Sequence, residues 1–291
     1  MQHSQDIIHS IFTLAPKNEV WRTSIKGLTI HAADHALAFS GYVQEPSLCV
    51  VLLGERQICT NGQCQIFSRQ EMMFCPVNLP IVTQSISASE NQPYLALSLQ
   101  LDFELISQVI RQLPSKKISE ATSSRHKWGL ENEIEDCLIR LINLLHFPNY
   151  IEFLSPLILR ELYFYLLQSE QGDYLRSLLS KEGNIAKIAQ ATEILAQQFA
   201  KPLNMTELAR RVGMSVAGFY AHFKNVTAMT PLQYQKSLRL NVAREKLQSG
   251  LGVSETAYQI GYESPSQFSR EYKRQFGESP SSIGKQAVGF S

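Results

Sequence analysis

Residues 205–224 read MTELARRVGMSVAGFYAHFK, and this stretch predicts two short helices joined by a tight turn. The apolar positions of the first helix fall on one face, at Leu208, Ala209 and Val212. Gly213 then supplies the left-handed backbone conformation that a tight turn requires. In the second helix, Phe219 and Phe223 recur four residues apart and form an apolar stripe that packs on the first helix. This pattern is typical of a helix-turn-helix, but an ordinary helical hairpin inside a core has the same spacing.

A second copy of the pattern favours DNA binding. Residues 253–273 read VSETAYQIGYESPSQFSREYK and repeat the alanine, the glycine and both aromatic positions with one extra residue in the turn. Between the copies, residues 231–248 predict one amphipathic helix that begins at a proline. We expect its buried side to carry Tyr234, Leu238, Val242 and Leu247, and its outer side Lys236, Arg239, Arg244 and Lys246. A helix of this length suits a spacer between two recognition helices on one face of DNA.

Residues 184–286 resemble the DNA-binding domain of AraC/XylS-type transcription regulators. The resemblance rests on LARRVGMSVAGFYAHFK in the first copy, PLQYQKSLRLNVAREKL in the connecting helix and TAYQIGYESPSQFSREYKRQFGESP from residue 256. It implies sequence-specific binding to double-stranded promoter DNA, and contact with RNA polymerase if the protein is an activator. The candidate DNA contacts in the first recognition helix are Val216, Ala217, Tyr220, Ala221 and Lys224. Those in the second are Pro265, Ser266, Gln267, Ser269, Arg270 and Lys273.

The two recognition helices differ in the chemistry that they offer to base edges. Arg270 is the strongest candidate for direct readout, because a guanidinium can bind guanine through two hydrogen bonds. The alternative for Arg270 is a phosphate contact, which carries no sequence information. The first helix departs from the family pattern, since Ala221 stands where an arginine is frequent. Ala217, Tyr220 and Ala221 therefore predict apolar contact with thymine methyl groups and a half-site that tolerates A·T pairs.

Length and charge agree with two domains of different roles. The chain has 291 residues, which is enough for two cores. Residues 1–183 carry 14 Lys and Arg against 19 Asp and Glu, whereas residues 184–291 carry 13 against 7. The basic half is the half with the repeat, as expected for a module that binds phosphates, although a basic surface can also be a solvated face. The start of the chain lacks a basic and then apolar leader, so we expect a cytoplasmic protein that makes no membrane contact.

The first half predicts strands. Eight short apolar or alternating runs, separated by turn residues, fall at residues 27–31, 36–39, 48–53, 56–60, 65–67, 71–74, 81–87 and 94–101. The pair Asn61-Gly62 predicts a hairpin. YVQEPSLCVVLLGERQ, NLPIVTQSISAS and PYLALSLQLD resemble the cupin-like N-terminal domain of AraC-type regulators, over residues 27–111. The expected fold is two-domain α+β. Residues 1–183 form a cupin-like β-barrel with flanking helices, and residues 184–291 form two helix-turn-helix units joined by a long helix.

Such N-terminal domains sense a small molecule or mediate dimerisation, as the resemblance implies. A barrel interior is the expected effector pocket, and Tyr42, Glu45, Ser47 and Cys49 near its mouth are candidate contacts, with turn or core positions as the alternative. Apolar residues from 130 to 145 and from 157 to 167 predict two helices that pack on the barrel or on a second protomer. Residues 115–127 predict an exposed loop.

Three other functions are compatible with parts of the sequence. A metal-dependent cupin enzyme needs a cluster of histidines, but His31 and His35 fall early and the strands from 48 to 101 contain none. We therefore expect no enzyme, metal or cofactor. A regulator without a ligand is a second alternative. The third is a thiol sensor, because Cys49, Cys59, Cys64 and Cys75 lie in neighbouring predicted strands. The five cysteines predict no disulfide framework.

Overall fold

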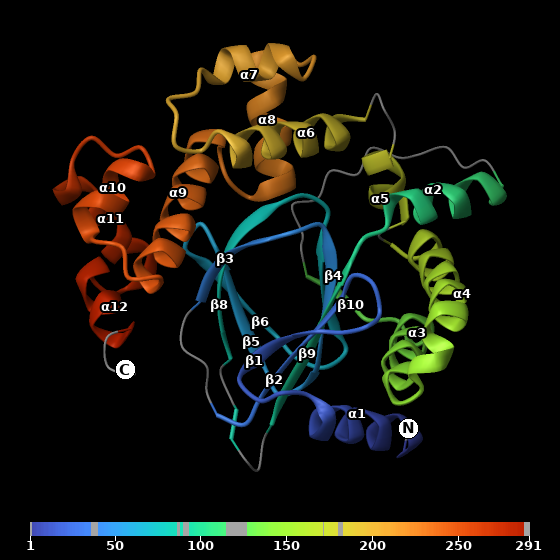
Figure 1. Ribbon diagram of the computed structural model, residues 1–291. Coiled ribbons are helices and arrows are strands. Elements are labelled where there is room, and N and C mark those ends of the chain that lie inside the picture. The colour runs from blue at the N-terminus through green and yellow to red at the C-terminus, as the bar shows by residue number, and fades with distance from the viewer. Residues whose placement is uncertain are drawn as a thin grey trace.

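The computed structural model describes residues 2–35, 40–85, 88–89, 93–114, 127–170, 172–179 and 183–287. Its first part is built on two β-sheets flanked by helices, and its last part is helical (Figure 1). One sheet has six strands in the order β1-β2-β9-β4-β7-β10, and the other has four in the order β3-β8-β5-β6. The paired strands are antiparallel.

The strands follow the alternating patterns of the sequence. Their bounds are β1 Glu19–Arg22, β2 Leu28–Ala33, β3 Ser40–Gln44, β4 Ser47–Leu53, β5 Arg56–Thr60, β6 Gln63–Phe67, β7 Glu71–Cys75, β8 Leu79–Ser85, β9 Tyr94–Gln100 and β10 Lys127–Gly129. Seven of the eight predicted strands are confirmed, with small shifts at their ends. The eighth, at residues 36–39, lies outside the described residues. The sequence missed β1, β3 and β10, which are short and only partly buried.

The predicted hairpin is confirmed in its detail. Asn61 and Gly62 both have positive φ, 50° and 76°, and they connect β5 to β6 in the register Thr60 to Gln63. A two-residue turn with two left-handed residues matches the twist of the flanking strands. The larger architecture differs from the expected barrel, because the described strands form two separate sheets with no hydrogen-bonded closure between them.

Helices of the first part cover the six-stranded sheet and its ends (Figure 1). They are α1 Gln2–Leu14, α2 Phe103–Gln112, α3 Asn132–Asn143, α4 Pro148–Gln168 and α5 Gly172–Leu179, with a 3-10 turn at Leu144–His146. The two predicted helices after residue 130 are confirmed, and α3 packs along α4. The predicted loop at residues 115–127 lies outside the described residues except for Lys127, which is in β10.

The helical domain contains both predicted helix-turn-helix units. Its elements are α6 Asn184–Gln197, α7 Met205–Arg211, α8 Val216–Thr227, α9 Pro231–Gln248, α10 Val253–Gln259, α11 Pro265–Phe276 and α12 Pro280–Ala287. The first unit is α7 and α8, the second is α10 and α11, and α9 connects them. The expected domain boundary, between residues 183 and 184, falls at the N-cap of α6 and stays a prediction.

The expectation that α9 has an outer basic face is wrong. Arg244 is only 4% exposed and pairs with Glu278 at 2.9 Å. The Arg239 guanidinium donates to the carbonyls of Phe199, at 2.7 Å, and Gly261, at 3.0 Å. Arg244 is buried and Arg239 is half-buried because α9 packs against other elements on several sides. The expected pattern of one buried and one outer face therefore does not describe this helix. Val242, expected on the buried side, is only partly buried.

One of these neighbours is the four-stranded sheet. The Asn241 side chain donates to the carbonyls of Tyr42, at 3.0 Å, and Ile81, at 3.3 Å, in β3 and β8. The Tyr234 hydroxyl donates to the carbonyl of Asn78 at 2.6 Å. At Gly41 a Cβ atom would lie 2.7 Å from the Phe276 ring, so a glycine is needed where the domains meet. The central helix of the DNA-binding domain therefore also forms the contact with the sheets.

A disulfide within the hairpin corrects one expectation about the cysteines. Cys59 and Cys64 are cross-strand partners in β5 and β6, and their sulfur atoms are bonded. The sequence predicted no disulfide framework, because the facing of Cys59 and Cys64 depends on the register of the two strands. Cys49, Cys75 and Cys137 are free thiols.

The glycines of the two turns offer a matched test of the repeat. Gly213 and Gly261 both have positive φ, 68° and 86°. A Cβ at Gly213 would meet nothing within 4 Å, whereas a Cβ at Gly261 would lie 2.0 Å from the carbonyl oxygen of Ala200. Gly213→Ala should cost only left-handed strain, roughly 1–2 kcal/mol. Gly261→Ala should add a backbone clash of roughly 1–3 kcal/mol. Urea unfolding of both variants measures the difference, and equal losses of stability would contradict this packing.

Candidate nucleic-acid interface and effector cavity

The first helix-turn-helix is defined by its caps. The Asn204 side chain accepts from the backbone N–H of Thr206 at 2.9 Å and so begins α7. The Ser215 hydroxyl accepts from the backbone N–H of Gly218 at 3.2 Å and begins α8. Phe219 and Phe223 are fully buried with their rings edge to face. Burial of these rings fixes which face of α8 remains outside.

The predicted contacts of α8 lie on that outer face. Val216, Ala217, Ala221 and Lys224 are exposed, and Tyr220 is half-buried with its ring against Phe219. Four of the five residues are apolar or aromatic, so the surface offers little hydrogen-bonding capacity. The structure places these residues together, and their contact with bases stays a prediction.

The second unit repeats this construction. The Ser264 hydroxyl accepts from the N–H of Gln267, and Pro265 occupies the first turn of α11, where its missing N–H costs nothing. Phe268 and Tyr272 are fully buried. The six predicted contacts lie on the remaining surface, with Ser266, Gln267, Arg270 and Lys273 exposed and Pro265 and Ser269 half-buried.

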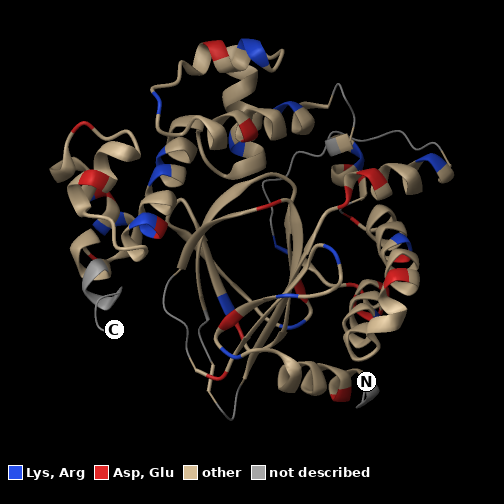
Figure 2. Cartoon of the chain, in the orientation of Figure 1, with Lys and Arg blue, Asp and Glu red and all other residues tan. Residues whose placement is uncertain are grey.

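The side chains of this face differ in their freedom to meet DNA. The Ser269 hydroxyl donates to the carbonyl of Pro265 at 2.9 Å, and the Gln267 amide approaches Glu271 at 3.5 Å. Arg270 and Lys273 form no ion pair with any described residue. Lys and Arg also lie on α7 and α9 (Figure 2). Exposed Arg210 and Arg211 at the end of α7 are further cations that the sequence analysis did not select, although their position in a last helical turn was visible.

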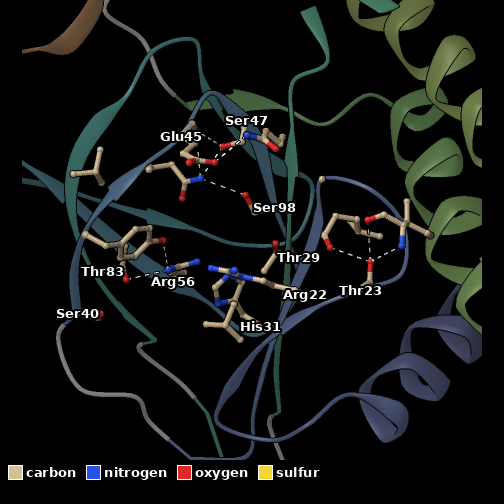
Figure 3. Close-up of a pocket in the computed structure, with 18 of the residues that line it drawn as sticks. Arg22, Thr23, Thr29, His31, Ser40, Glu45, Ser47, Arg56, Thr83 and Ser98 are labelled. Atoms are coloured by element: carbon tan, nitrogen blue, oxygen red, sulfur yellow. Dashed lines mark hydrogen bonds between the residues drawn. The ribbon is translucent and has the colours of Figure 1, made fainter. Parts of the chain in front are cut away.

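A cavity of about 800 Å³ opens between the two sheets (Figure 3). Residues from β1, β2, β3, β4, β5, β8 and β9 line it, so its wall combines both sheets. Of the four predicted effector contacts, Tyr42, Glu45 and Ser47 lie in this wall. Cys49 instead lines a much smaller space behind it, and its thiol donates to the Ser98 hydroxyl at 3.4 Å.

Arg56 is the cavity residue that sequence reasoning missed. Its guanidinium donates to the Tyr42 hydroxyl at 2.8 Å and to the Thr83 hydroxyl at 3.0 Å. In the sequence it is an ordinary polar position of an alternating strand, and no local pattern distinguishes it. Figure 3 shows Arg22, Arg56 and the His31 ring directed toward the same part of the cavity.

The histidines of this region do not converge. His31 lies in the cavity wall, where burial, and then the charge of Arg56, lower its pKa to about 3. The His35 ring lies against the Asp34 carboxylate at 2.9 Å. Within the part of the chain that the structure describes, no three His, Cys, Asp or Glu side chains gather as metal ligands.

Comparison with known families identifies both parts of the chain. Residues 24–174 match the model of the AraC-type transcriptional regulator N-terminus, and residues 208–286 match a helix-turn-helix domain. The first match alone spans more than half of the chain. The chain belongs to the AraC-type transcriptional regulators. The predicted family and the predicted class of regulator are thereby confirmed.

Relatives of this AraC-type chain align with it over part of its length. A probable thc operon regulatory protein of Rhodococcus erythropolis is 32% identical over 121 residues, 40% of this chain and 36% of the relative. The transcriptional activator RhaS of Yersinia pestis is 31% identical over 120 residues, 41% of each chain. The chain thus spans about two fifths of the length of these relatives.

Solved structures agree with the fold over nearly the whole chain. ToxT of Vibrio cholerae, in a structure with an unsaturated fatty acid bound, superposes with a TM-score of 0.55. The alignment covers 93% of this AraC-type chain and 99% of ToxT at 11% identity. At this identity the likeness shows the fold. Within the described residues, no helix has the length and apolar character to span a bilayer.

The lowered pKa of His31 predicts a pH-dependent stability. In the unfolded chain this imidazole takes up a proton near pH 6.5, but the folded protein does not protonate it until about pH 3. The unfolded state therefore binds more protons between these values, and the free energy of unfolding falls as the pH is lowered. His31 should contribute a slope of up to about 1.4 kcal/mol per pH unit.

Urea unfolding at pH 5.5 and 4.5 tests this contribution. His31→Gln should lose less stability than the wild type between the two pH values. His222→Gln, which replaces a partly exposed histidine on α8, is the matched control and should follow the wild type. An unchanged slope in the His31 variant would show that this imidazole is not held neutral.

Proposed function

We propose that the protein is a DNA-binding transcription regulator that reads one promoter site through both helix-turn-helix units. The observation that supports this most directly is the paired construction of α8 and α11, each begun by a serine cap and each with its aromatic stripe buried and its other face outside. Two such helices joined through one central helix suit adjacent segments of the major groove. Contact with RNA polymerase belongs to the proposal if the protein is an activator.

The two units are proposed to contribute unequally to specificity. Arg270 presents an exposed guanidinium that pairs with no carboxylate of the described segments, and bidentate binding to guanine is the frequent use of such a group. Lys273, one turn further along α11, is placed for a phosphate. Ala217 and Ala221 on α8 offer methyl groups, which suit thymine.

Binding-site selection with randomised DNA tests whether both units bind one site and whether they contribute unequally to specificity. The wild type should yield two adjacent half-sites, of which the one bound by α11 contains a required guanine. Arg270→Ala should lose that guanine preference and roughly 1–3 kcal/mol of affinity for the selected site. Lys273→Ala, the matched control, should weaken all sequences alike and reduce the salt dependence of binding by about one ion.

Other outcomes of the selection would contradict the proposal. Binding without any sequence preference would remove the regulator function. A uniform loss in Arg270→Ala would assign that side chain to a phosphate. The half-site bound by α8 could instead show a strong guanine preference. If Ala217→Gly and Ala221→Gly left that preference in place, the proposed contact of α8 with thymine methyl groups would be contradicted.

We also propose that the cavity between the sheets receives a small-molecule effector. Its support is the volume of the cavity and the convergence of polar side chains from both sheets. The similar structures of ToxT were solved with an unsaturated fatty acid and with a substituted butenoic acid. Tyr42 connects the cavity with the DNA-binding domain, because its hydroxyl accepts from Arg56 and its carbonyl accepts from Asn241.

A homodimer is the proposed assembly, through a defined apolar stripe on α4. The stripe consists of Tyr150, Phe153, Leu157 and Phe164, which are 57%, 75%, 55% and 40% exposed. Their spacing of three, four and seven residues is the heptad spacing of helices that pair with one another. An apolar stripe of this kind is rare on a monomer surface, and a second copy of α4 presents the complementary pattern.

Sedimentation equilibrium tests the dimer. Phe153→Glu should raise the dimer dissociation constant about thirtyfold or more, because it places a charge at the centre of the stripe. Leu14→Glu is the matched control, since Leu14 is also an exposed apolar residue but lies on α1. A wild-type protein that is monomeric at micromolar concentration would overturn the proposal.

Three alternatives have less support. A metal-dependent enzyme would need a ligand cluster that the described residues do not provide. A thiol sensor needs a reactive thiolate, but burial raises the pKa of Cys75 well above its usual range and that of Cys137 to about 11. A regulator without an effector leaves the cavity unexplained. We propose a cytoplasmic location, because the promoter DNA that the protein would bind is there.

A further inference from the structure

The effector cavity carries an excess of positive charge. Arg22, Lys26 and Arg56 line it, and Glu45 is the one carboxylate among its described lining residues. The Glu45 side chain is exposed and accepts a hydrogen bond from the Gln100 amide at 2.9 Å. Within the described residues, no carboxylate pairs with Arg22 or Arg56.

Arg56 is the cation whose environment points to a ligand. Arg56 is half-buried, and a guanidinium withdrawn from water without a counter-ion is costly. Its described partners are the neutral hydroxyls of Tyr42, Thr83 and Tyr94. The contacts to Tyr42 and Thr83 use one nitrogen, Nη2, of a group that has five N–H donors. The planar fork of arginine suits the oxygens of a carboxylate or phosphate.

A second donor lies beside this guanidinium. Tyr94 is 1% exposed and lines the cavity, and its hydroxyl lies against the Arg56 guanidinium, which acts on it through a hydrogen bond and its charge. Burial raises the pKa of Tyr94 to about 12, so the hydroxyl keeps its proton and can donate it. A guanidinium can only donate, so the Tyr94 oxygen accepts from Arg56, and among the described residues its own proton meets no acceptor. A bound oxyanion would accept this proton.

The rest of the lining is rich in hydroxyl and amide groups. They belong to Thr23, Thr29, Ser40, Gln44, Ser47, Thr83, Gln84, Ser98 and Gln100. At one end, the Gln44 amide, the Ser47 hydroxyl and the Ser98 hydroxyl form a network with contacts of 2.7 and 3.3 Å. Part of the hydrogen-bonding capacity of this lining is used internally. A long acyl chain would leave the remaining capacity unused, whereas a hydroxylated molecule would pair with it.

We propose that the cavity binds a small hydroxylated molecule that carries an oxyanion, a carboxylate or a phosphate, anchored by Arg56 and Tyr94. The inference rests on the proposed effector site and names the class of its ligand. It also separates this chain from an acyl-chain sensor of the same fold. Arg22 and His31 complete the anion subsite, at the place where Figure 3 shows them directed toward Arg56.

Calorimetric titration of the full chain with four probes tests the proposed class of ligand. D-gluconate and glucose 6-phosphate carry hydroxyls with a carboxylate or a phosphate, sorbitol carries hydroxyls alone, and dodecanoate carries a carboxylate on an acyl chain. Gluconate or glucose 6-phosphate should bind at least about tenfold more tightly than sorbitol and dodecanoate. The better of the two identifies the oxyanion. Tightest binding of dodecanoate or sorbitol, or binding of no probe at 10 mM, overturns the proposal.

Two variants separate a ligand anchor from a structural arginine. Arg56→Met should weaken the better probe by at least about tenfold, yet its Tm without probe should equal or exceed that of the wild type, because an unpaired buried charge is removed. Arg69→Met is the matched control. It breaks the ion pair with Glu135, at 3.2 Å, and should leave probe binding unchanged. Unaltered binding in Arg56→Met, or a lower Tm than that of Arg69→Met, overturns the anchor.

Failure of the ligand inference can be distinguished from failure of the proposed DNA-binding function. A wild-type protein that binds its selected DNA site but no probe overturns this inference and leaves the regulator function standing. A protein that binds a probe but no specific DNA overturns the proposed function and leaves the ligand class standing. Bound oxyanion should also raise the pKa of His31, which NMR titration of the imidazole measures directly.

Discussion

The packing of α9 is the constraint on which the rest of the structure depends. This helix is in contact with both helix-turn-helix units and with the four-stranded sheet, and its Asn241 side chain bonds two strand carbonyls. The two recognition helices are therefore held by the same element that holds the sheets. Tyr42 belongs to both environments, because its hydroxyl faces Arg56 in the cavity and its carbonyl accepts from Asn241. A ligand that moved Tyr42 would act directly on the helix that connects the two helix-turn-helix units.

Burial of α9 also changes the electrostatics of the DNA-binding domain. Its net positive charge suggested a basic surface, but Arg244 is paired with Glu278, Lys236 is paired with Glu271, and Arg239 is bonded to backbone carbonyls. These cations stabilise the domain. Because they are already paired or hydrogen-bonded within it, they contribute little to binding phosphates. Exposed cations lie on the recognition helices and at the end of α7. Net charge alone therefore overestimates the electrostatic footprint.

The cavity presents the opposite case, because half-buried Arg56 faces an open space of about 800 Å³ and no described carboxylate pairs with it. Charges withdrawn from water in proteins are normally paired. The acyl ligands of structures with the same fold do not transfer to this chain, because fold similarity at 11% identity leaves the lining side chains free to differ. Ligand chemistry is a property of the side chains, and here they are mostly hydroxyls, amides and guanidinium groups.

The sequence by itself determined the features that rest on local spacing. The repeated alanine, glycine and aromatic positions specify both helix-turn-helix units, because caps, turn and buried stripe all lie within about twenty residues of each other. Asn61-Gly62 specifies its hairpin for the same reason. Tertiary structure alone decided the burial of Arg244, the pairing of Cys59 with Cys64, the separation into two sheets and the position of Arg56. These features depend on segments that meet only in the folded chain, as Tyr42 and Asn241 do across 199 residues, and no local period records such a contact.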